Sequence, residues 1–158
     1  ASPTPSPTPT PPPGTGQCTS STGPGIPPPA SVPGGVAGFH ASWYGQSGYQ
    51  SLCPGTQATA TVASYNTGSS GWVSGKLGEV AYLGTWNPIP GQDQPSTLGG
   101  DGTSGSPNTG WPRFNRVALQ PANYVGPGPV AWFHCTVHAP TIPGPCTLAI
   151  RPLPGGPQ

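Results

Sequence analysis

Residues 57–65 read QATATVASY, a segment in which the side chains alternate in character along the chain. A period of two places neighbouring side chains on opposite faces of an extended backbone. One face carries Ala58, Ala60, Val62 and Ser64, and the other carries Thr59, Thr61, Ala63 and Tyr65. This pattern predicts a β-strand, and the turn-forming sequence NTGSSG at 66–71 indicates where the strand ends.

Strand signals recur on both sides of this segment, separated by turns rich in Gly and Pro. The expected strands are residues 39–44, 57–65, 72–73, 79–86, 113–119, 130–138 and 146–151. A long loop is expected at 87–112, and no window has the periodicity of a helix. Six or seven short strands at such intervals predict an all-β protein with an antiparallel β-sandwich, which we place at residues 39–158.

The composition is unusual for a folded domain. The chain of 158 residues contains 27 Pro and 26 Gly, and only 4% of its residues are charged. Chains so rich in Pro and Gly are commonly disordered, but a net charge of +1 is too small for the charge-driven form of disorder. Five Trp and five Tyr supply large apolar surfaces. We therefore expect one small domain with an aromatic core, preceded by an extended arm.

That arm is expected to span residues 1–38. Residues 1–13 read ASPTPSPTPTPPP, in which Pro fixes φ and removes the backbone donors that helices and sheets require. The expected conformation is polyproline II or disorder, with a polyproline II length of about 40 Å. The few apolar anchors in the rest of the arm are Ile26, Val32 and Val36.

The Ser/Thr/Pro run is also typical of O-glycosylated segments. The expected attachment sites are Ser2, Thr4, Ser6, Thr8 and Thr10, and the sequence contains no N-glycosylation sequon. The chain begins with Ala and has no apolar signal core, which we interpret as a mature chain after export. The expected location is extracellular, either secreted or on the cell surface.

The charge count excludes nucleic acid as a partner, because phosphate binding needs several cations and the chain has only four Lys and Arg. No apolar run is long enough for a membrane span.

Four cysteines without a CxxC spacing favour disulfides over zinc. Cys135 and Cys146 flank a turn-rich segment, so a hairpin would bring them together. Cys18 would then pair with Cys53 by elimination. In a competing interpretation, Cys18 bonds to a neighbouring subunit.

Catalysis and metal binding have little support. The acids are Glu79, Asp93 and Asp101, and a glycosidase needs two of them about 5–9.5 Å apart across a sugar. The Asp-Gly sequence at 101–102 is typical of turns and lacks the acidic density of calcium loops. His134 and His138 would lie about 13 Å apart along one strand, too far for one metal ion. We therefore expect no enzyme activity, no cofactor and no metal.

The tryptophans allow two interpretations, as core residues or as platforms for sugar rings. Trp72 and Trp132 lie inside strand signals and are expected to be buried. Trp86 and Trp111 stand at the two ends of the 87–112 loop and are the candidates for sugar stacking.

A resemblance rests on YNTG at 65–68, on Trp72, and on the aromatic strand AWF at 131–133 followed by Ala139-Pro140. In this order the motifs resemble the tryptophan-rich immunoglobulin-like domain of autophagy cargo receptors, which has extracellular bacterial relatives. The resemblance implies an immunoglobulin-like sandwich used for binding or assembly. The Ser/Thr/Pro arm separately resembles the linkers of secreted bacterial polysaccharide hydrolases.

Two functions follow as hypotheses. The first is a structural subunit of an extracellular filament or surface assembly, a homopolymer in which the arm docks on a neighbouring copy through Ile26, Val32 and Val36. An arm already extended by Pro loses less entropy on docking than a flexible tail. The alternative is a carbohydrate-binding accessory module, in which the arm is only a linker.

Overall fold

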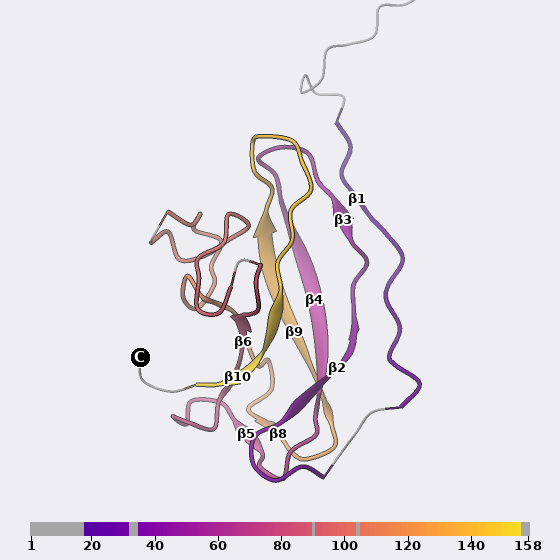
Figure 1. Cartoon of the computed structure of the whole chain (residues 1–158), viewed down its shortest axis with the longest axis vertical. Coiled ribbons are helices and arrows are strands. Elements are labelled where there is room, and N and C mark those ends of the chain that lie inside the picture. Colours follow the sequence, from indigo (N-terminus) through magenta and orange to yellow (C-terminus); the bar gives the residue numbers. More distant parts are fainter. Residues whose placement is uncertain (1–17, 32–34, 90, 104, 156–158) are drawn as a thin grey trace, which may run out of the picture.

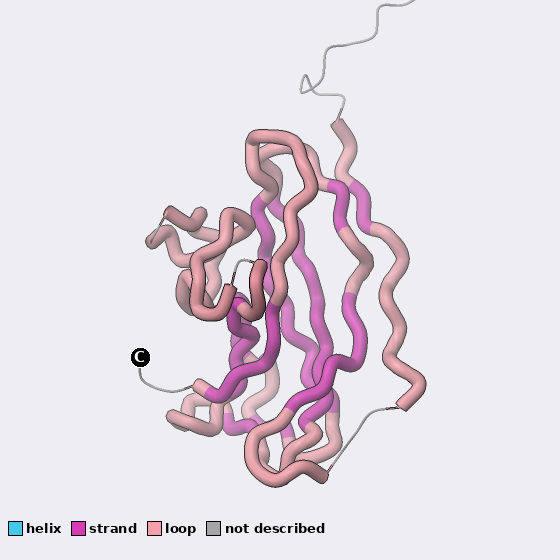
Figure 2. The backbone as a smooth tube through the Cα atoms, in the orientation of Figure 1, coloured by secondary structure: helices cyan, strands magenta, loops and turns pink. Residues whose placement is uncertain are grey.

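The computed structural model describes residues 18–31, 35–89, 91–103 and 105–155. These residues form ten strands and no helix (Figures 1 and 2). The strands are β1 (Ser21–Thr22), β2 (Ala41–Gln46), β3 (Gln50–Ser51), β4 (Gln57–Asn66), β5 (Trp72–Val73), β6 (Ala81–Thr85), β7 (Arg116–Leu119), β8 (Tyr124–Val125), β9 (Val130–His138) and β10 (Ile150–Pro154). The all-β prediction is confirmed.

Two three-stranded antiparallel sheets make up the body of the fold, with strand orders β2-β4-β9 and β10-β6-β7. Two short pairs, β1-β3 and β5-β8, complete the pairing. Buried residues from both large sheets and from β5 and β8 join one hydrophobic cluster. The two sheets therefore share a single core.

Strand β4 is the centre of its sheet, as the alternation at 57–65 suggests. It pairs along its whole predicted length with β9, in a register that places Val62 opposite Phe133 and Ala60 opposite Cys135. These four residues belong to the core cluster or pack against it. The face that carries Ala58, Ala60, Val62 and Ser64 is thus the core face.

The aromatic part of the core surrounds Trp72. Its ring stacks on Phe39 at a centroid distance of 5.2 Å and meets Phe133 at 6.4 Å. Leu83 and Val117 of the second sheet are also buried there. Aromatic burial thus replaces much of the aliphatic core that this sequence lacks.

The predicted pairing of residues 130–138 with residues 146–151 is wrong. Strand β9 pairs with β4, whereas β10 pairs with β6 in the other sheet. The turn-rich segment between β9 and β10 reverses the chain direction, but it also carries the chain from one sheet to the other (Figure 1).

The predicted disulfide between Cys135 and Cys146 fails for the same reason. Both cysteines are free thiols. Cys135 is buried on the core face of β9, while Cys146 is exposed in the crossing segment. Two side chains in such different surroundings cannot meet in the observed register.

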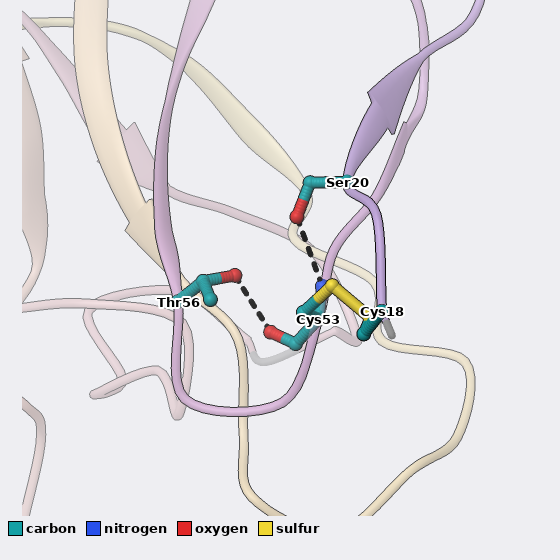
Figure 3. The surroundings of a disulfide bond; sticks show 4 residues. All are labelled: Cys18, Ser20, Cys53 and Thr56. Carbon is teal, nitrogen blue, oxygen red and sulfur yellow. Dashed lines mark hydrogen bonds between the residues drawn. A yellow bond between two sulfur atoms is a disulfide. The ribbon is translucent and has the colours of Figure 1, made fainter. Parts of the chain in front are cut away.

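The other disulfide is formed within the chain, between Cys18 and Cys53, with their Cα atoms 5.7 Å apart (Figure 3). The Ser20 hydroxyl accepts a hydrogen bond from the Cys53 amide at 3.1 Å. Beyond this clamp, Ser21 and Thr22 pair with β3, and Ile26 forms a bridge with Gln46. Residues 18–26 therefore pair with β3 and with the end of β2 in the same chain.

Among the described residues, no helix has the length and apolar character that a membrane span requires.

Candidate functional site

A groove with aromatic side chains opens at the end of the β2-β4-β9 sheet where β4 finishes. Its volume is about 700 Å³. We call it the aromatic groove. Its lining residues are Pro28, Pro29, Ala30, Ser31, Gly35, Tyr44, Tyr65, Asn66, Thr67, Gly68, Ser69, Pro127 and Gly128. None of these side chains carries a charge. The groove is thus suited to an uncharged, largely apolar ligand.

Two tyrosines and one tryptophan form a ring cluster at the groove. The Tyr44 ring meets the Tyr65 ring edge-on at 5.2 Å and the Trp132 ring edge-on at 5.9 Å. Trp132 is 48% exposed. Ala63 lies between Gly45 and Trp132 in the strand register and is fully buried. The cluster therefore packs on the sheet face opposite the core while its rings remain reachable from solvent.

A β-bulge accounts for the place of Tyr44. The register of β2 against β4 shifts between Trp43 and Gly45, which leaves Tyr44 as the extra residue. An extra residue in one strand redirects the side chains around it. The alternation pattern alone does not predict this position.

The N-terminal segment forms one wall of the groove. Ile26 exchanges two backbone hydrogen bonds with Gln46, at 2.9 and 3.2 Å, and Pro28 and Pro29 follow it into the groove wall. Gly45 allows this approach, since a Cβ there would lie 3.1 Å from the Ile26 carbonyl oxygen. A larger residue at this position would push the segment away from the sheet edge.

Asn66, the last residue of β4, lines the groove. Its side-chain amide donates to the carbonyls of Ser70 and Val125, and its Oδ1 accepts from the Gly68 amide. The side chain is fully buried. This one residue ties the 66–71 turn to β8, and the sequence signal for a turn did not indicate that role.

The groove also offers hydrogen-bond donors. No hydrogen bond joins the phenol of Tyr44 or Tyr65 to another described residue, so both hydroxyls can donate to a ligand. A free carbonyl oxygen would be a suitable acceptor.

The tryptophans proposed for sugar stacking lie elsewhere, and the prediction for Trp111 is wrong. Trp111 is 4% exposed, belongs to the core, and donates its indole N–H to the Thr136 carbonyl at 2.7 Å. Trp86 is partly buried, and the Arg151 guanidinium covers its ring at 3.4 Å from the centroid. The expected burial of Trp72 is confirmed, but that of Trp132 is not.

Each acid has a local partner. Asp93 accepts from Arg116 at 2.7 Å, and Glu79 pairs with Lys76 across one turn. Hydrogen bonds from Thr103 hold the pKa of the Asp101 carboxyl below its usual value. Among the described residues, no three His, Cys, Asp or Glu side chains gather as metal ligands would.

The predicted assembly residues differ in their surroundings. Ile26 is engaged with its own sheet edge, so its predicted docking on a neighbour is replaced by a contact within the chain. Val36 forms a bridge with Gly68 and is 41% exposed. Val32 and the proposed glycan sites Ser2, Thr4, Ser6, Thr8 and Thr10 lie outside the described residues.

No protein-family model, no curated protein and no solved structure matches this chain. The likeness to the immunoglobulin-like domain of autophagy receptors therefore stays a prediction.

Proposed function

We propose that the protein is an extracellular structural subunit, an immunoglobulin-like sandwich that joins copies of itself through its N-terminal arm into a filament or surface assembly. The observation that carries this proposal is the position of the arm's anchor. Cys18 is bonded to Cys53, which precedes the first residue of β4, whereas the aromatic groove lies at the last residues of β4.

Ten residues of strand separate these two ends, which corresponds to about 30 Å. Cys18, to which residues 1–17 are joined in sequence, thus lies at the end of the domain opposite to the open groove. A contact from one end of a subunit to the opposite end of the next uses two different surfaces. Such heterologous contacts propagate into filaments unless a rotation closes them into a ring.

The composition supports the same proposal. With 4% charged residues, the surface has few like charges to keep copies apart. Strand edges in such a protein also lack the Lys and Glu residues that commonly guard against pairing. The disulfide suits the oxidising conditions outside the cell.

Deletion of residues 1–17 tests the proposal. The shortened chain keeps Cys18 and every described contact, so it should fold. Deleting all of 1–38 would instead remove β1 and the Ile26 bridge. We expect the full chain to form filaments or large oligomers in electron microscopy and light scattering, and the shortened chain to stay monomeric. A full chain that remains monomeric at high concentration would overturn the proposal.

A carbohydrate-binding module is the second candidate, and the exposed ring cluster favours it. Half-exposed Trp132 beside Tyr44 gives an uncharged aromatic surface of the kind on which sugar rings stack. Sedimentation of the shortened chain with insoluble polysaccharides, compared with its Trp132→Ala variant, tests this function. Binding that the substitution abolishes would support it.

A further inference from the structure

We propose that the aromatic groove is a receptor for polyproline, and that its ligand is the proline-rich segment, residues 1–13, of a second copy of this chain. This inference rests on the proposed function, because it names the site and the ligand that would join neighbouring subunits.

The chemistry of the groove suits a polyproline ligand. Polyproline II segments bind in grooves walled by aromatic rings, where the rings pack on the proline faces. Tyr44 and Tyr65 supply such rings, and Pro28, Pro29 and Pro127 supply apolar walls. Polyproline II has no internal hydrogen bonds, so its carbonyl oxygens remain free as acceptors. The two phenol hydroxyls can donate to them.

The proline-rich segment fits the groove in charge and in size. Seven of the residues in 1–13 are Pro, the others are Ala, Ser or Thr, and none carries a charged side chain. Binding of this segment buries no side-chain charge in the uncharged groove, whereas an acidic or basic peptide would leave its charges unpaired there. A volume of about 700 Å³ falls within the range of ordinary ligand sites.

The positions of the clamp and the groove indicate which copy supplies the segment. The Cys18–Cys53 clamp and the groove lie at opposite ends of β4, about 30 Å apart. Only residues 14–17 separate the proline-rich segment from the clamp. A second copy placed end to end would bring its groove to the Cys18 end of the first copy, where the proline-rich segment is joined through residues 14–17.

A peptide with the sequence of residues 1–13 provides the test. It is titrated into the chain lacking residues 1–17, and binding is followed by NMR and by tryptophan fluorescence. We expect saturable binding that the combined Tyr44→Ala and Tyr65→Ala substitutions weaken by at least about tenfold. The matched control is Tyr49→Ala, which removes a tyrosine that is 78% exposed and lies outside the groove. Its affinity should stay within about twofold of the parent.

The same substitutions are then made in the full chain. We expect the double variant to lose assembly and the Tyr49→Ala variant to retain it. Assembly that persists in the double variant, together with a peptide that does not bind, would overturn the groove as receptor while leaving the proposed function intact. A full chain that never assembles would overturn the proposed function instead, even where the peptide binds.

Two further outcomes would also decide against the proposal. Oligosaccharide binding that requires Tyr44 and Tyr65, without peptide binding, would assign the groove to sugar. A monomeric full chain whose groove NMR signals match those of the peptide-bound shortened chain would show that the segment docks on its own domain.

Discussion

The two faces of the β2-β4-β9 sheet both carry aromatic clusters, but the clusters differ in burial. On the inner face, Phe133 and Trp72 are fully buried and pack together with Phe39. On the outer face, Trp132 immediately precedes Phe133 in the sequence, yet it is half exposed and belongs to the ring cluster with Tyr44 and Tyr65. In a chain with few charges, the same residue types are buried in the core on one face and partly exposed to solvent on the other.

Adjacent alanine substitutions in β9 test this division most strongly. Phe133→Ala should lower the free energy of unfolding by about 3–5 kcal/mol, because it removes a fully buried ring and leaves a cavity. Trp132→Ala should change it by less than about 1 kcal/mol, since much of its ring already contacts water. Urea denaturation followed by circular dichroism measures both. Equal losses would mean that the outer cluster also belongs to the core.

The disulfide clamp should have the next largest effect. It closes a loop across a sequence separation of 35, for which the chain-entropy model gives a stabilisation of about 3–4 kcal/mol. We expect the Cys18→Ser and Cys53→Ser double variant to lose about 3 kcal/mol and to exchange the Ile26 amide faster, because that segment is held at the sheet edge by few backbone bonds.

Reduction of the parent protein should reproduce this result, and Cys146→Ser is the matched control because that thiol is free. Unchanged exchange at Ile26 in the double variant would show that backbone pairing alone holds the groove wall.

The sequence predicts the strands well because alternation is a local property. It predicts the partners of strands poorly, since Pro and Gly between β9 and β10 mark a change of direction without saying whether the chain stays in one sheet. The alternation of residues in β9 indicates which of its faces points into the core. Ala131, Phe133 and Cys135 share one apolar face, whereas Trp132 shares its face with His134. The groove itself was not predictable, because it depends on a bulge at Tyr44 and on a wall from a distant segment.

Asn66 connects the two regions, and its substitution should have an intermediate effect. Asn66→Ala would remove the side-chain partner of the Val125 carbonyl and of the Gly68 amide, both in buried hydrogen bonds, at a cost of about 2 kcal/mol in unfolding free energy. The same change should loosen the 66–71 turn and weaken binding of the 1–13 peptide. Ser70→Ala is the control, because its exposed side chain lies outside the groove and the substitution keeps the backbone carbonyl that accepts from Asn66. An unchanged peptide affinity in the Asn66→Ala variant would show that binding in the groove does not depend on the conformation of the 66–71 turn.

The buried thiol of Cys135 provides the smallest and most specific test of the inner face. Burial raises the pKa of Cys135 to about 11, although a backbone hydrogen bond with Ala60 acts in the opposite direction. In the unfolded chain the thiol ionises near its ordinary value of 9.0. The folded state therefore holds its proton at pH values where the unfolded state has lost it, and stability falls as pH rises from about 9 towards 11.

We expect the parent protein to lose about 1 kcal/mol more than a Cys135→Ala variant between pH 9 and 10. All other residues are the same in both proteins, so their contributions cancel in the difference. Thiol labelling gives an independent measurement at pH 8, where exposed Cys146 should react at once and Cys135 only on unfolding. Parallel stability curves and rapid labelling of both thiols would mean that water reaches the core face of β9. The contrast between the two faces of the sheet would then no longer hold.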